Sequence, residues 1–93
     1  MSIAIKKLSD DVFEVTVVEI STTAHTVTIS DQSLNDLTDK KVTKTQLLEL
    51  SFKFLLDREP NTSILSSFDI NVISKYFSDF RDEVRRWCDE SQN

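Results

Sequence analysis

The single histidine and the single cysteine are the residues of this chain best suited to acid–base or nucleophilic chemistry. A general base at His25 also needs a nucleophile or a carboxylate brought beside it by the fold, and no such partner is evident in the sequence. Cys88 shares a helical face with Val84 and Trp87, where cysteine usually packs as a small hydrophobe. We therefore expect packing or surface roles for both residues and no enzymatic activity.

Metal and phosphate sites are disfavoured by composition. One histidine and one cysteine argue against a tetrahedral zinc site built from protein ligands, and a single cysteine excludes an internal disulfide. The acidic segments 10–11 and 79–83 do not follow the calcium-loop pattern, which requires a central glycine. The chain contains no glycine, so glycine-rich phosphate loops are also excluded. We expect no cofactor and no metal ion.

Basic residues near the C-terminus form the one cluster that could bind an anion or stack on a nucleic-acid base. Arg81, Arg85 and Arg86 lie in one predicted helix beside Trp87. Asp82 precedes Arg86 by four residues, which is the spacing of a surface ion pair on a helix. Because such pairs are common and weak, we interpret this cluster mainly as a solvated helical face.

The rest of the chain is organised around a helix predicted within the segment VTKTQLLELSFKFLLDREP, which begins at Val42. Thr43 and Gln46 have the spacing of a capping box, in which each side chain bonds the backbone amide of the other residue. Pro60 ends the helix because it lacks an amide hydrogen and disfavours helical geometry before it. The apolar residues recur at helical spacing over a wide stripe: Leu47, Leu48, Leu50, Phe52, Phe54, Leu55 and Leu56. Neighbouring elements must therefore cover this helix.

Three strands are predicted before this helix, at residues 3–8, 12–20 and 25–30, because β-branched residues are frequent there and turn residues separate them. Short links favour an antiparallel meander. Further helices are expected at residues 31–37 and 69–90, with a short helical turn after Asn61 that carries Ile64, Leu65 and Phe68. This order predicts a single α+β domain over residues 1–93: an N-terminal three-stranded antiparallel meander followed by three to four helices packed on one face.

Size and charge limit the partners of this domain. The chain has 93 residues and a net charge of −5, which opposes nonspecific binding to nucleic acid or to an anionic membrane. No apolar run approaches the ~20 residues needed to cross a bilayer, and the N-terminal segment lacks the apolar core of a signal peptide. We expect a cytoplasmic protein without a membrane partner.

Residues 25–59 resemble the ribbon-helix-helix proteins, a family of small DNA-binding regulators and antitoxins. A strand (HTVTIS), a short helix (DQSLNDLT), a polar turn (DKKV) and a longer helix carry the resemblance. In that family the strands of two subunits pair and read the major groove, while the start of the second helix holds phosphate. The resemblance implies that Thr26 and Thr28 face bases, and that Lys41, Thr43 and Lys44 approach the DNA backbone.

The segment from Thr43 to Phe77 is similar to a family of small uncharacterised bacterial proteins with a strand-rich N-terminus and a helical C-terminus. The string REPNTSILSSFDINVISKYF carries this resemblance. It implies the α+β fold and a bacterial cytosolic origin. It implies no activity and no catalytic residue.

We predict a noncatalytic protein-interaction domain, which acts through apolar surface on its helices and binds a protein partner or a second copy as a homodimer. A three-stranded sheet is too small to cover every apolar side chain of these helices. Aromatic and arginine side chains often anchor partners, so the candidate partner-binding residues are Phe54, Phe80, Arg81, Arg85 and Trp87. The alternative is a ribbon-helix-helix DNA-binding regulator, which the acidic net charge places second.

Overall fold

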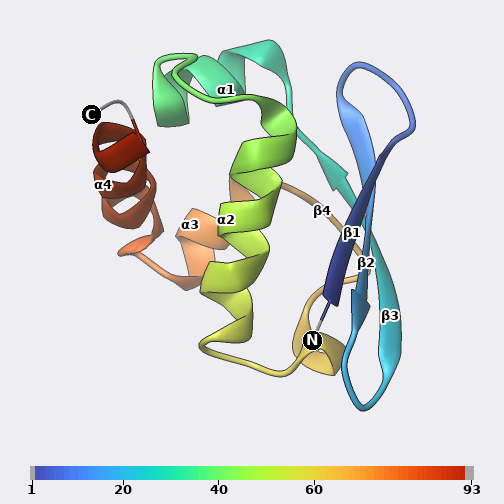
Figure 1. Ribbon diagram of the computed structural model, residues 1–93. Helices are drawn as coiled ribbons and strands as arrows, with labels where there is room; N and C mark the ends of the chain where they lie inside the picture. The colour runs from blue at the N-terminus through green and yellow to red at the C-terminus, as the bar shows by residue number, and fades with distance from the viewer. Residues whose placement is uncertain (1, 92–93) are drawn as a thin grey trace.

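The computed structural model describes residues 2–91, with a twisted sheet on one side and the helices on the other (Figure 1). Strands β1 (Ser2–Lys7), β2 (Val12–Val18) and β3 (Thr22–Thr28) pair antiparallel in chain order. Residues 13, 15 and 17 of β2 are buried, whereas the residues between them lie on the solvent face. This alternation fixes which face meets the helices. The α+β class and the meander of the first three strands are confirmed.

The sheet is nevertheless four-stranded and mixed, so the prediction of a three-stranded, purely antiparallel sheet is wrong. Strand β4 (Ser67–Asp69) pairs parallel with β3, placing Thr26 opposite Ser67 where a helical turn was expected. The free edge of β3 offers backbone partners to the returning chain, and Ser66 and Ser67 are weak helix formers. Three residues are too few to show the two-residue alternation of a strand.

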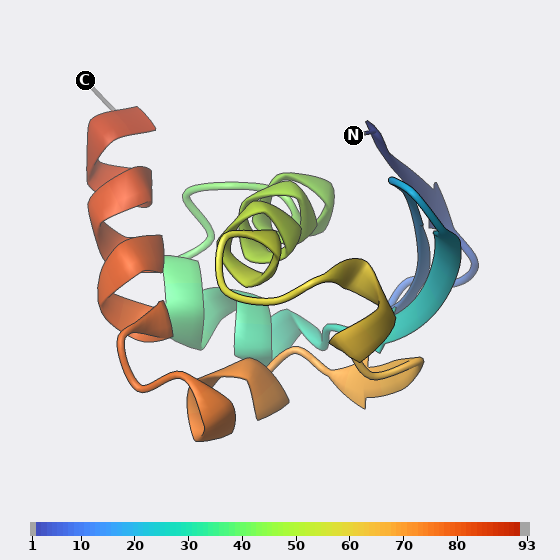
Figure 2. The same cartoon turned by 90° about the horizontal axis from the view of Figure 1, so that it is seen from below.

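The helices lie on one face of this sheet, with α2 between the sheet and α4 (Figure 2). They are α1 (Asp31–Thr38), α2 (Lys44–Leu56), α3 (Val72–Tyr76) and α4 (Phe80–Ser91), and a 3-10 turn, η1 (Asn61–Ser63), follows α2. The predicted capping box of Thr43 and Gln46 is present at the start of α2. The region predicted as helical from residue 69 thus contains two helices. Within residues 2–91, no helix combines the length and the apolar character that crossing a membrane requires.

Helix α2 is the centre of the hydrophobic core, because it is covered from two sides. Its buried residues include Leu47, Leu48, Phe52, Phe54 and Leu55. The sheet covers one side with the inward-facing residues of β2 and β3, and α4 covers another side with residues 80, 84 and 88. The wide apolar stripe of α2 is therefore buried partly against the sheet and partly against α4.

The connection between α1 and α2 has a strained backbone. Asp39 and Lys40 adopt left-handed geometry, with φ angles of 53° and 57°. The amide of Asp39 bonds to the carbonyl of Asn35 and so closes the end of α1. Glycine usually occupies such positions, because a side chain costs roughly 1–2 kcal/mol per residue in this geometry. The chain has no glycine to place there.

Candidate interaction site

Two of the five predicted partner-binding residues lie in the core. Phe80 is fully buried and Phe54 is 5% exposed. Their ring centroids are 5.2 Å apart, and the Phe54 ring also meets the ring of Phe77 edge to face at 5.8 Å. Both rings are buried because α4 packs on the side of α2 that the sheet leaves open. Neither ring is available to anchor a partner.

The other three predicted residues lie on α4 and do not form one apolar surface. Arg81 and Arg85 are exposed, whereas Trp87 is partly buried against the core. The ion pair expected between residues 82 and 86 is replaced by one between Glu83 and Arg86, which are also one turn apart. The α4 surface is therefore mainly polar, as a solvated helical face is.

An apolar groove of about 250 Å³ lies elsewhere, between the C-terminal end of α2, η1, β4 and α3. Leu65 and Tyr76 at this groove are 48% and 70% exposed. Phe68, Val72 and Phe77 are partly buried and also line the groove. Figure 2 shows η1, β4 and α3 along the lower part of the view, with the C-terminal end of α2 above them. The groove therefore gathers the half-exposed apolar side chains that the short elements leave uncovered.

Arg58 fixes the end of α2 beside this groove. Its Nη1 donates to the carbonyl of Phe54 at 3.1 Å, and its Nη2 bonds the carboxylate of Asp79 at 2.6 Å. The guanidinium carbon also lies 3.5 Å from the centroid of the Phe54 ring. Such a cation–π contact contributes about 0.5–1 kcal/mol at an exposed site. These contacts tie the end of α2 to the segment between α3 and α4.

A chain of hydrogen-bonded polar side chains, which we call the polar chain, positions Leu65 at the groove. The Asn61 amide nitrogen donates to the carbonyl of Ser21 at 2.9 Å and to the hydroxyl of Thr23 at 3.0 Å. His25, which is 2% exposed, has Nε2 at 2.8 Å from the Thr23 hydroxyl and Nδ1 at 2.8 Å from the carbonyl of Leu65. A carbonyl only accepts hydrogen bonds, so Nδ1 donates to Leu65; in the neutral ring Nε2 then carries no proton and accepts from the Thr23 hydroxyl. His25 thus has a structural role, and holds Leu65 beside the groove.

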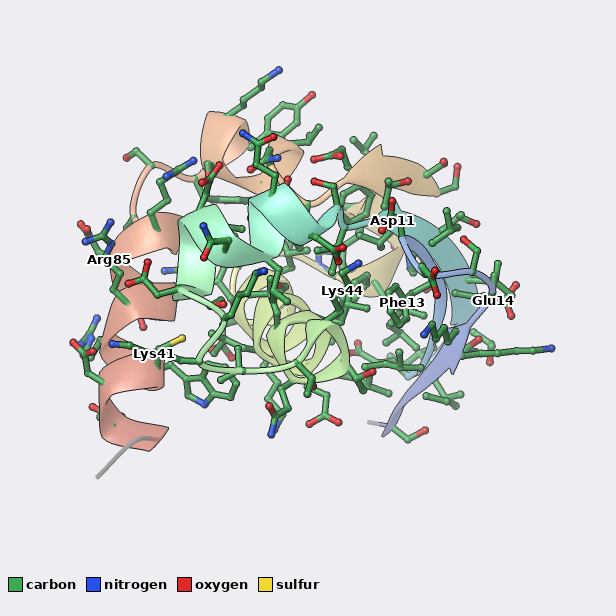
Figure 3. All side chains as sticks on the ribbon, turned by 90° about the horizontal axis from the view of Figure 1, so that it is seen from above. Asp11, Phe13, Glu14, Lys41, Lys44 and Arg85 are labelled. Carbon is green, nitrogen blue, oxygen red and sulfur yellow. The ribbon has the colours of Figure 1, made fainter. Side chains whose placement is uncertain are left out.

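Lys44 links three elements at the other end of α2 (Figure 3). Its Nζ lies 2.9 Å from the carboxylate of Asp11 and 2.8 Å from that of Asp31, and donates to the carbonyl of Asp10. Desolvation acts to lower the pKa of Lys44, but hydrogen bonds and charge from Asp31 and Asp11 outweigh it and raise this pKa. The hydrogen bond and charge of Lys44 in turn lower the pKa of Asp31. The amine of Lys44 is thus paired with two carboxylates, whereas the ribbon-helix-helix resemblance assigns it a phosphate contact.

The residues that could have carried chemistry are placed for packing. Cys88 is 2% exposed, and burial raises the pKa of its thiol. Within residues 2–91 no carboxylate bonds to His25, whose two ring nitrogens face a hydroxyl and a carbonyl. In the described part of the chain, no group of three or more His, Cys, Asp or Glu side chains is arranged to hold a metal ion.

Comparison with protein-family models, with curated proteins and with solved structures finds no match to this chain. The groove is therefore interpreted from its own residues.

The groove is not evident from the sequence, although most of its residues are recognisably apolar. The sequence places Leu65 and Phe68 in a helical turn, and Tyr76 and Phe77 within the helical region predicted at residues 69–90. In the structure, β4 and α3 are only three and five residues long, too short to enclose these side chains. The available signal was the pair of serines at residues 66 and 67, which interrupts any helical pattern between Leu65 and Phe68.

Proposed function

We propose that this chain is a small noncatalytic domain that binds a protein partner through the groove between α2, β4 and α3. The observation that carries the proposal is the exposure of Leu65 and Tyr76 beside the partly buried Phe68 and Phe77. Exposed apolar residues gathered in one place, rather than scattered, mark interaction sites on soluble proteins. Tyrosine is also among the residues that most often contribute strongly to binding.

The chemistry of the groove favours a protein segment over a small polar substrate. Among the described residues that line it, polar groups come only from Glu59, Ser63 and the hydroxyl of Tyr76. Catalytic and small-molecule sites usually bring several polar groups together at one point. An apolar lining with a single carboxylate instead suits apolar side chains of another chain.

The pairing of β3 supports this proposal over the DNA-binding alternative. A ribbon-helix-helix dimer requires the strand at residues 25–30 to pair with the same strand of a second subunit. Here β3 pairs with β2 along one edge and with β4 along the other, within the same chain. Thr26 and Thr28 lie opposite Ser67 and Asp69 in this pairing. We therefore place the interaction surface at the groove.

Affinity capture with matched variants tests the proposal. Tyr76→Lys places a charge in the groove, whereas Ile20→Lys makes the same change at a fully exposed residue after β2. The tagged full chain and both variants are incubated with extract of the cells that produce the protein, and retained proteins are quantified by mass spectrometry. A strongly contributing aromatic residue is worth at least about 2 kcal/mol, which corresponds to roughly 30-fold in affinity. We expect proteins that the wild type and Ile20→Lys retain and Tyr76→Lys loses.

Equal retention by all three proteins, or specific retention by none, would contradict a groove-dependent interaction. Sedimentation equilibrium of the wild type decides whether the partner is a second copy. A dimer that Tyr76→Lys dissociates and Ile20→Lys preserves would identify self-association through the groove. A monomer at every concentration would leave a different protein as the partner.

A further inference from the structure

We propose that the partner contributes an extended segment, which adds as a further strand to the free edge of β4 and carries a lysine or arginine beside its apolar side chains. This inference rests on the proposed function of the groove. It specifies the conformation and the chemistry of the segment that binds there.

The backbone around β4 has hydrogen-bonding groups available for another strand. The amide of Thr26 donates to the carbonyl of Ser66 at 2.8 Å, and the amide of Ile70 donates to the carbonyl of Thr28 at 3.0 Å. In a parallel ladder, alternate residues of a strand bond to the same neighbour. The residues that face β3 are therefore 66, 68 and 70, while Ser67 and Asp69 direct their N–H and C=O groups to the opposite side.

That opposite side of β4 has no strand on it. The sheet order places β4 at the edge, and within residues 2–91 no turn or loop hydrogen bond reaches the backbone of Ser67 or Asp69. Native sheets often blunt an open edge with lysine or proline. Here the edge residues are serine, phenylalanine and aspartate, and the Asp69 carboxylate is bonded to the backbone and side chain of Asn71. Two residues of the edge thus remain able to pair.

The groove lies beside β4, where it would contact side chains of an added strand. Phe68 pairs with Val27, a fully buried residue, so its side chain is on the helix-covered face of the sheet, and it lines the groove with Val72 and Tyr76. Side chains of a strand alternate between the two faces, so every second side chain of an added strand would lie on the face of Phe68. Main-chain pairing then gives affinity and the groove selects apolar side chains, as in other cases of strand addition.

Glu59 determines the charge of the segment. It lines the groove, is partly buried, and forms no hydrogen bond or ion pair through its side chain with residues 2–91. An acidic segment would be repelled by this carboxylate and by the net charge of −5. A lysine or arginine next to the groove-filling side chain would instead pair with Glu59, at little desolvation cost because the carboxylate is only partly buried.

Peptide selection tests the inference. Random heptapeptides displayed on phage are selected on the full chain and counter-selected on Tyr76→Lys. We expect enriched sequences in which apolar residues alternate with polar ones and a lysine or arginine is frequent. Enrichment of apolar residues at the spacing of a helix, or of acidic sequences, would overturn strand addition while leaving the groove as a binding site. No enrichment at all would count against both proposals.

Amide exchange measured by NMR with the most enriched peptide then locates the contact. The amides of Ser67 and Asp69 should exchange quickly in the free protein and at least 10-fold more slowly with saturating peptide, whereas the amide of Ile70 should be protected in both states. Resonances of Leu65 and Tyr76 that shift without new protection at Ser67 and Asp69 would support the groove and refute the added strand.

Substitutions at Ser67 provide an independent readout of the same contact. Ser67→Pro removes the outward amide without removing a bond of the β3–β4 ladder, and should weaken peptide binding at least 10-fold. Ser67→Ala keeps the amide and should bind as the wild type does. Glu59→Gln should selectively weaken peptides that carry lysine or arginine. Equal binding by all three variants would refute the proposed mode, and unfolding of Ser67→Pro would leave the exchange measurement to decide.

Discussion

The hydroxyl of Thr23 should be worth far more to the stability of the fold than its size suggests. Thr23→Val keeps the β-branched shape, so it opens no cavity and preserves the strand preference of the residue. It removes the one hydrogen bond to Nε2 of His25 and one acceptor of Asn61. Because His25 is 2% exposed, water cannot replace the lost partner in the native structure.

The expected cost follows from this unsatisfied nitrogen. Leaving a buried donor or acceptor without a partner costs about 1–3 kcal/mol. Asn61 keeps its 2.9 Å hydrogen bond to Ser21, so losing its bond to Thr23 adds little to this cost. For a domain of this size, 1 kcal/mol shifts the melting temperature by roughly 4–8 °C. We expect the melting temperature, measured by circular dichroism, to fall by about 4–24 °C.

Thr26→Val is the matched control, because Thr26 lies on the same strand and forms no side-chain hydrogen bond in the described residues. It should change the free energy of unfolding by less than about 0.5 kcal/mol, as surface substitutions usually do. A double-mutant cycle with His25→Leu should show coupling above about 0.5 kcal/mol, since the two side chains share one bond. Equal melting temperatures for Thr23→Val and Thr26→Val would refute the proposed role of this polar chain.

Further predictions concern other parts of the molecule. Lys44→Met should lower the free energy of unfolding by about 1 kcal/mol, a value reduced by the solvent exposure of its partners. The pKa of Lys44 is raised in the folded protein. In urea unfolding, the stability difference between the wild type and this variant should therefore be complete below the ordinary lysine pKa of about 10.4 and decline above it. The lowered pKa of Asp31 has the opposite sign, so its contribution should be present above about pH 3.9 and decline in more acidic solution. Lys40→Gly should stabilise the fold by about 0.5–1 kcal/mol in the same assay by relieving the positive φ, while Lys40→Ala should not, and a loss of stability in Lys40→Gly would contradict the strain. Cys88 should react slowly with a thiol reagent in the native protein and quickly in urea, because the thiol is buried and its pKa raised; rapid native labelling would contradict this.

Elements with strong local signals were predictable from the sequence. The capping box of α2 depends on Thr43 and Gln46 alone, and Pro60 follows the end of that helix, so no distant contact is needed to recognise either. The alternation in β2 extends over seven residues, long enough to distinguish a strand from a helix. These elements formed as expected because local preference and tertiary packing agree.

The sheet edge and the site were not predictable, because both depend on contacts between residues far apart in the chain. Strand β4 exists through its pairing with β3, about forty residues earlier, and nothing within Ser67–Asp69 indicates a strand. The apolar pattern of α2 likewise shows that Phe54 needs cover, but not that α4 supplies it. The sequence therefore singles out Phe54 and Phe80, which are buried, and does not distinguish the exposed Leu65 and Tyr76.

The shortness of β4 and α3 explains both the missed prediction and the groove. A longer α3 would extend over Phe68, and a longer β4 would carry Leu65 into the sheet, so either change would fill the groove from within the chain. Instead the polar chain from Asn61 to His25 holds Leu65 in place without covering it, at the expense of burying several polar groups. Such a chain is useful where the position of an exposed residue matters. Replacing all members of such a chain by apolar groups can be nearly neutral. Combined apolar substitutions at residues 23, 25 and 61 should therefore preserve the free energy of unfolding in urea, while weakening the proposed interaction through the groove.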